Sequence, residues 1–104
     1  MAELERKELM IIDEESIKDL IYEIRGEKVM LDFDLARIYG YATRDFNNQV
    51  KHNIERFPER YRFQLTKEEL FEILKWKKST SSWGGIRKLP YAFTEFGIYM
   101  LYHH

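Results

Sequence analysis

The chain has 104 residues, of which 44% are apolar and 15% aromatic. A chain of this length and apolar content is expected to fold as one small domain and not to remain disordered. It contains no cysteine, which excludes disulfides, thiolate zinc sites and cysteine nucleophiles. It has neither the run of ~20 apolar residues that a membrane helix needs nor a signal-peptide pattern, so we expect a cytoplasmic protein.

The formal net charge of −1 conceals an asymmetry along the chain. Residues 1–34 carry a net charge of −6, whereas residues 35–104 carry +5. The stretch over residues 75–88 contains five cations and no acid. Such a polarised domain suits a polyanionic partner on one face. An acidic N-terminal segment that packs against a basic body explains the same charges equally well.

Residues 1–21 are expected to form an acidic helical extension, because acids at the start of a helix complement its dipole. The domain proper is expected over residues 22–102, and His103 and His104 are interpreted as a tag remnant. Residues 22–31 predict a β-hairpin, in which Gly26 followed by Glu27 favours a type II′ turn.

Two helices are predicted next, separated by a short turn. The first runs from Asp32, as its N-cap, to Tyr39, and Gly40 suits the left-handed position that ends a helix. Thr43 is expected to cap the second helix after a turn of about three residues, which is the arrangement of a helix-turn-helix. One apolar stripe predicts the buried side of the second helix, formed by Phe46, Val50, Ile54 and Phe57.

The C-terminal half predicts two more strands and two more helices. A strand is expected around Phe63, and residues 66–69 are a capping box that opens a helix. A second strand is expected over residues 89–93, with Pro90 at its start or at a sheet edge. The last helix, which Thr94 opens, is apolar on nearly every side and needs cover from several directions. The predicted class is α+β, with a β-hairpin, a helix-turn-helix-like helix pair and a winglike basic loop.

The outer face of the second predicted helix carries residue types that read DNA. Arg can bond to guanine and Asn to adenine in the major groove, while Lys and His can meet phosphates. An ordinary surface helix also has a polar outer side, and Glu55 is unfavourable beside phosphate. The residues that would face DNA are Arg44, Asn47, Asn48, Lys51 and His52.

The basic loop that follows the third predicted helix is rich in hydrogen-bond donors for phosphate. The pair Gly84-Gly85 permits close approach of the backbone to a partner, so the loop would act as a wing beside the helix pair. The alternative is a polar loop whose Trp83 folds back onto the core. The predicted contacts are Lys75, Lys77, Lys78, Ser82, Trp83, Arg87 and Lys88.

Catalysis has little support in the sequence. Asp32 and Asp34 do not share a helix face, and no cysteine or acidic cluster accompanies His52 at metal-ligand spacing. Gly84-Gly85 lacks the Gly-Lys-Ser/Thr of a phosphate-binding loop. We therefore predict a protein that is not an enzyme and that holds neither a cofactor nor a metal ion.

Several long motifs occur in one order. They are IRGEKVMLD at 24–32, LARIYG at 35–40, NQVKHNIERFP at 48–58, FQLTKEE at 63–69, TSSWGG at 80–85 and LPYAFTE at 89–95, followed by Gly97. Together they closely resemble the phage-associated domain named after the N-terminal part of open reading frame six, a relative of the KilA-N and Bro-N domains. The resemblance spans residues 24–101 and implies a small α+β DNA-binding domain of phage antirepressors and prophage regulators. In that family Phe96 is more often a polar residue.

We therefore expect a phage-derived transcriptional regulator or antirepressor domain that binds double-stranded DNA, with the helix from Thr43 in the major groove and the residue 75–88 loop on the backbone. The alternative is a protein-binding module that sequesters a repressor, with Trp83, Tyr91 and Phe96 as its anchors. Independently of this choice, the apolar C-terminal helix offers a surface through which two copies of the chain could associate.

Overall fold

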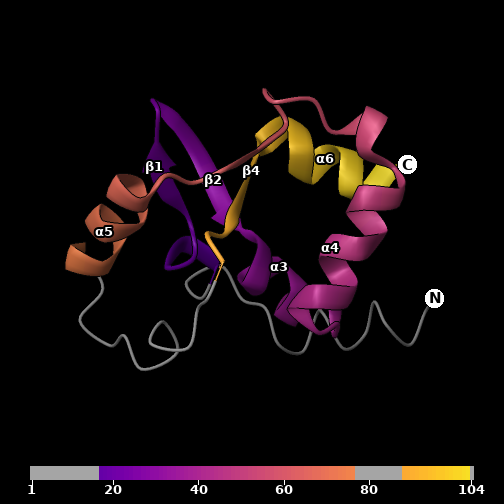
Figure 1. Ribbon diagram of the computed structural model, residues 1–104, viewed down its shortest axis with the longest axis horizontal. Helices are drawn as coiled ribbons and strands as arrows, with labels where there is room; N and C mark the ends of the chain where they lie inside the picture. The colour runs from indigo at the N-terminus through magenta and orange to yellow at the C-terminus, as the bar shows by residue number, and fades with distance from the viewer. Residues whose placement is uncertain (1–16, 77–87, 104) are drawn as a thin grey trace.

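Four antiparallel strands form the sheet on which the helices pack (Figure 1). The computed structural model describes residues 17–76 and 88–103. The sheet order is β1-β2-β4-β3, made of β1 (Tyr22–Ile24), β2 (Glu27–Leu31), β4 (Tyr91–Thr94) and β3 (Arg62–Gln64). The helices are α3 (Asp32–Tyr39), α4 (Thr43–His52), the short 3-10 helix η1 (Ile54–Arg56), α5 (Lys67–Trp76) and α6 (Glu95–His103). The predicted α+β class is confirmed. Of the expected N-terminal extension, residues 1–16 lie outside the described residues.

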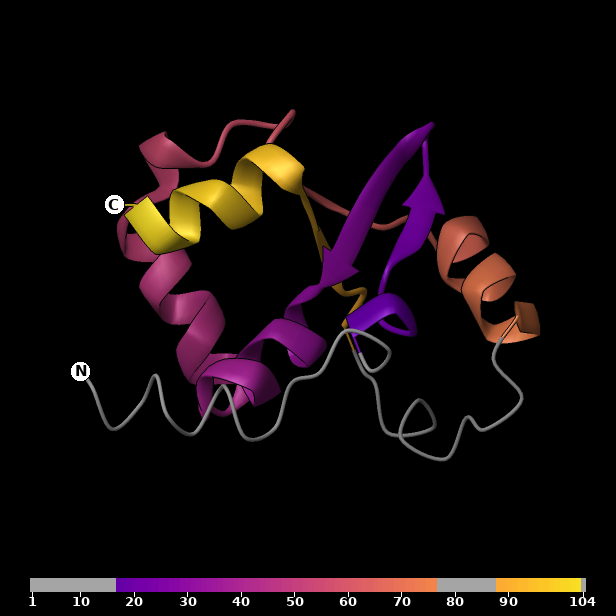
Figure 2. The same ribbon diagram turned by 180° about the vertical axis from the view of Figure 1, so that it is seen from behind.

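Helices cover both faces of the sheet, as the opposed views in Figures 1 and 2 show. Neighbouring residues of a strand point to opposite faces. In the paired strands β2 and β4, Leu31 and Ala92 therefore pack on the side of α5, together with Ile73. Met30 and Phe93 pack on the other side, among residues of α3 and α4. The two buried clusters thus share the sheet as their common wall.

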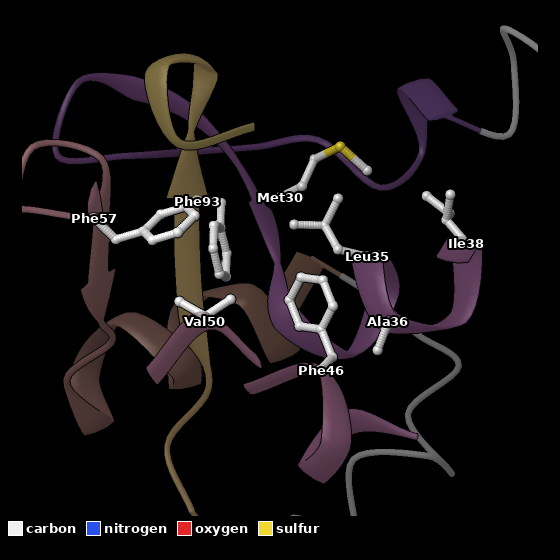
Figure 3. Packing of buried hydrophobic residues seen from close by; sticks show 8 residues of the cluster. All are labelled: Met30, Leu35, Ala36, Ile38, Phe46, Val50, Phe57 and Phe93. Carbon is white, nitrogen blue, oxygen red and sulfur yellow. The ribbon is translucent and has the colours of Figure 1, made fainter. Parts of the chain in front are cut away.

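Phe93 is the centre of the larger cluster (Figure 3). Its side chain is fully buried, and the rings of Phe46 and Phe57 meet it edge-on at centroid distances of 5.6 and 6.0 Å. Edge-to-face aromatic pairs of this kind add about 0.5–1.5 kcal/mol each beyond the area that they bury. Because Phe46 belongs to α4 and Phe93 to β4, this contact places α4 against the sheet.

The predicted inner stripe of the second helix is confirmed at three of its four positions. Phe46, Val50 and Phe57 are buried, but Ile54 is 45% exposed. The reason is that α4 ends at His52, and Asn53 leaves the helical region with φ −123° and ψ 36°. Ile54 therefore falls outside the helical period that the sequence pattern assumed.

The hairpin turn differs by one residue from the predicted one. Ile24 pairs with Glu27, so the loop is Arg25-Gly26, and both residues have positive φ (56° and 76°). This is the backbone pattern of a type I′ turn and not of type II′. Arg25 is held in its left-handed conformation by contacts from afar: its Nε lies 2.7 Å from Glu69 Oε2, and its guanidinium lies 4.0 Å from the centre of the Phe63 ring.

The capping box that opens α5 is confirmed. The Glu69 amide donates to Thr66 Oγ1 at 3.1 Å, and the Thr66 amide donates to Glu69 Oε1 at 2.8 Å. The hydrogen bond from Arg25 to the same carboxylate lowers the pKa of Glu69. Glu69 therefore caps its own helix and also binds the tip of the hairpin.

The last helix begins at a tight crossing with the segment before β3. Thr94 Oγ1 donates to the carbonyl of Arg60 at 2.8 Å and accepts from the Gly97 amide at 3.4 Å, so Thr94 caps α6. A Cβ at Gly97 would clash with the backbone carbonyl of Tyr61. The crossing therefore requires glycine at this helical position.

We predict that Gly97→Ala destabilises the fold by about 1–3 kcal/mol, because an overpacked site forces backbone shifts. Helix propensity alone would give the opposite sign, since Ala is favoured over Gly by about 1 kcal/mol. Urea unfolding of the two chains measures the difference. An unchanged or higher free energy of unfolding in the variant would contradict the crossing.

Candidate nucleic-acid interface

A tight turn joins α3 to α4. Gly40 has φ 79°, its amide donates to Arg37 O at 3.1 Å, and the Tyr41 amide donates to Ala36 O at 2.8 Å. This is a Schellman ending with glycine in the left-handed position, as the sequence predicts. The expectation that Thr43 caps α4 is wrong by one residue: helical backbone already begins at Thr43, and Ala42 stands at the N-cap position.

Helix α4 has a buried and an exposed side. Phe46 and Val50 face the sheet, as Figure 3 shows. Arg44 has 85% of its side chain exposed and lies 3.7 Å from Asp45. The other predicted DNA-facing residues that are exposed on this helix are Asn48, Lys51 and His52.

Asn47 differs from these four exposed residues because it is half-buried and links two helices. Its Nδ2 donates to Asp32 Oδ2 at 2.9 Å. Asp32 is 4% exposed, and the same oxygen accepts the amide of Tyr91 at 3.2 Å. One buried carboxylate thus connects α3, α4 and β4.

The interpretation of Asp32 as a helix cap is wrong. Helix α3 follows β2 without a loop, Leu31 occupies the N-cap position, and the Asp32 side chain reaches other elements instead. Burial raises the pKa of Asp32, against the opposing effects of its hydrogen bonds to Asn47 and Tyr91. Because its folded pKa is raised, ionisation of Asp32 opposes folding as the pH rises through that value.

The described end of the basic loop is anchored to β3 before β4 begins. Lys88 is exposed. The carbonyl of Leu89 accepts Gln64 Nε2, and the carbonyl of Pro90 accepts the amide of Leu65, both at 2.9 Å. The strand predicted over residues 89–93 is present as β4, but it begins only at Tyr91, directly after Pro90, and it lies inside the sheet and not at its edge.

The side chain of Arg62 covers the ring of Tyr91, the residue that follows Pro90. The guanidinium of Arg62 lies 3.9 Å from the centre of the Tyr91 ring. Tyr91 is partly buried and also packs against the larger buried cluster, so its ring is less available as an interface anchor than its sequence position suggested. Neither Asp32 nor Arg62 was predicted as part of the site, because their partners are distant in sequence.

The sequence predicts the remaining contacts in a loop over residues 75–88, but Lys75 belongs to α5. Lys75 is exposed near the end of α5, and its Nζ lies 3.5 Å from Glu72 Oε2. The end of α5, the start of β4 and the α3–α4 turn all lie toward the lower side of Figures 1 and 2. The predicted contacts that lie outside the described residues are Lys77, Lys78, Ser82, Trp83 and Arg87.

A family model for the ORF6N domain matches residues 19–103, which is most of the chain. The chain belongs to the ORF6N domain family. No curated protein and no solved structure matches it. The match to the family model confirms the resemblance drawn from the sequence motifs at the level of the family. The family is phage-associated. Among the helices that the structure describes in this ORF6N domain, none has the length and apolarity to cross a membrane.

Adjacent asparagines on α4 of the ORF6N domain provide a matched test of the link to Asp32. We predict that Asn47→Ala lowers the free energy of unfolding by about 1–3 kcal/mol, because a buried carboxylate loses a donor. Asn48→Ala, at an exposed position, should change it by less than about 0.5 kcal/mol. Urea unfolding gives both values. Equal effects of the two substitutions would contradict a structural role for Asn47.

Proposed function

We propose that this ORF6N domain binds double-stranded DNA with α4 in the major groove. The observation that carries the proposal is the two-sided character of α4, which buries Phe46 against the sheet and presents Arg44, Asn48 and Lys51 to solvent. A tight turn joins α3 to α4, as a turn joins the two helices of a helix-turn-helix, whose second helix contacts base edges. Arg and Asn are the side chains that recognise guanine and adenine bidentately.

The basic loop is proposed to contact the DNA backbone beside α4. Its flanking residues Lys75 and Lys88 are exposed. In both views the elements that carry its two ends and the α3–α4 turn lie toward the lower edge, while α5 and α4 lie at opposite ends of the horizontal axis (Figures 1 and 2). In this proposal the protein is a non-catalytic, cytoplasmic regulator of transcription that needs no cofactor, and phosphate contacts supply most of its affinity.

Fluorescence anisotropy with mixed-sequence duplexes at low salt tests DNA binding. The logarithm of the affinity should fall with the logarithm of the salt concentration by about 0.9 per phosphate neutralised. Lys51→Ala should weaken binding to all sequences and reduce the steepness of this slope by about 0.9, the value for one phosphate contact. Asn48→Ala should instead alter the preference among sequences. Lys28→Ala is the matched control, because Lys28 is exposed on the β1–β2 hairpin, away from α4. Absence of binding at micromolar protein would contradict the proposal.

A second candidate function is protein binding through α6. Phe96, Tyr99 and Tyr102 are 59%, 63% and 58% exposed, and their spacing of three places them along one stripe of the helix. Phe96 stacks on Tyr61 with ring centroids 5.8 Å apart, and Tyr102 packs against Tyr39 at 5.6 Å. Exposed aromatic residues held in place in this way are typical of interface anchors. We propose a repressor protein or a second copy of the chain as the partner.

Sedimentation velocity over a range of concentrations tests association between copies. We predict that the native chain self-associates and that Tyr99→Ser weakens this association, because it removes the middle ring of the stripe. Phe71→Ser is the control, since Phe71 is 60% exposed but lies on α5, across the sheet. A chain that remains monomeric throughout, or equal effects of the two variants, would contradict self-association through α6.

A further inference from the structure

The Asp32 carboxylate is the point where the proposed recognition helix and the base of the basic loop meet. A single oxygen, Oδ2, accepts Asn47 Nδ2 from α4 and the Tyr91 amide from β4. The two donors are separated from Asp32 by 15 and 59 residues of sequence. The carboxylate is buried, and hydrogen bonds to a buried charge are directional and expensive to lose.

The other contacts between α4 and β4 are apolar. Phe46 meets Phe93 edge-on, and Val50 lies in the same cluster. Close apolar packing resists displacement of the helix, but only a hydrogen bond requires its donor and acceptor to meet at one distance and angle. The bonds at Asp32 supply direction, because both donors must reach one oxygen at the same time.

We propose that Asp32 is a positioning residue that fixes α4 relative to the start of β4, so that the exposed side of α4 and Lys88 contact one duplex together. The geometric half of this inference is that Asp32 holds α4 in a fixed position relative to β4, and it depends only on the fold. The DNA half is that this position allows joint contact with a duplex, and it rests on the function proposed above. Asn47 and the backbone of Tyr91 transmit the constraint, and the anchoring of Leu89 and Pro90 on β3 extends it toward Lys88.

A second buried carboxylate on the same helix provides the control. Asp34 is 4% exposed, as Asp32 is, and its Oδ1 lies 3.4 Å from Nη2 of Arg37 within α3. Asp34→Ala therefore removes a buried carboxylate of equal burial from α3, without removing the bonds to Asn47 and Tyr91. Any difference between Asp32→Ala and Asp34→Ala reports on these bonds and not on the general loss of a buried charge.

The geometric half is tested by measuring a distance inside the folded protein. The natural chain has no cysteine, so spin labels can be placed at Gln49→Cys on α4 and Lys88→Cys before β4, both exposed positions. Double electron–electron resonance spectroscopy then gives the distribution of distances between the labels. We expect a broader or shifted distribution in Asp32→Ala, and the unchanged distribution in Asp34→Ala and in Asp32→Asn, which keeps an acceptor oxygen.

Asn47→Ala keeps the test decisive if Asp32→Ala does not fold, since it removes only the bond to α4. It should also broaden the distribution. If Asp32→Ala folds and its distance distribution agrees with that of Asp34→Ala, the positioning role is overturned. If Asp32→Ala does not fold, an unchanged native distribution in Asn47→Ala overturns it.

The DNA half uses the same variants without labels. Asp32→Ala should lower the affinity for duplex DNA about tenfold relative to Asp34→Ala, within the usual range of coupling between sites, and Asp32→Asn should restore most of it. Equal affinities of Asp32→Ala and Asp34→Ala for duplex DNA would overturn this half. A native chain that binds no DNA would overturn the proposed function instead, while the distance measurement would still decide whether Asp32 positions α4.

Discussion

The structure depends on the insertion of the last strand between two strands that come earlier in the chain. Phe93 of β4 pairs with Met30 of β2 on one side and with Arg62 of β3 on the other, and its side chain is completely buried. Until β4 is in place, β2 and β3 have no hydrogen-bonded contact with each other in the four-stranded order. Such non-local pairing bears the cost of closing a long loop before any contact is gained. Both buried clusters depend on it, because β4 supplies Phe93 to one and Ala92 to the other.

The helices on one face follow from that strand. Helix α4 is placed by the rings of Phe46 and Phe57 against Phe93, and α6 is placed by Thr94, the last residue of β4. The apolar contacts supply stability, whereas polar bonds at Asp32 and Thr94 supply direction. Burying the Asp32 carboxylate is unfavourable in itself, as its raised pKa indicates. Such groups are weak evidence for stability and are better understood as fixing one arrangement among several of similar energy.

The two proposed surfaces lie on different helices of the same layer and do not compete for residues. The outer side of α4 is polar and suits a polyanion, while α6 exposes aromatic rings and suits a protein. An ORF6N domain with both surfaces would bind DNA and a protein partner at once. This arrangement is compatible with either a transcriptional regulator or an antirepressor, because the two differ in which surface dominates.

The elements predicted correctly from the sequence are those whose signals are local. The capping box at Thr66, the glycine turn at Gly40 and most of the inner stripe of α4 depend on residues within four or five positions of one another. Backbone geometry over so short a span leaves few alternatives. Apart from Asn47, the predicted DNA-facing residues of α4 are exposed for the same reason, since burial of Phe46 and Val50 settles which side remains.

Other features were decided by tertiary structure, because their partners are far away in sequence. The hairpin turn includes Arg25 since Glu69, 44 residues later, holds its guanidinium. Asp32 serves as a bridge and not as a cap, because its carboxylate accepts a hydrogen bond from the amide of Tyr91, 59 residues further on. Local propensity cannot anticipate either bond, and each one outweighs the local preference, since charge-assisted hydrogen bonds are stronger than a change of turn type or the loss of a side-chain cap. The sequence alone therefore determined the helices and the exposed side of α4, whereas the tertiary structure decided how that side is positioned against the base of the basic loop.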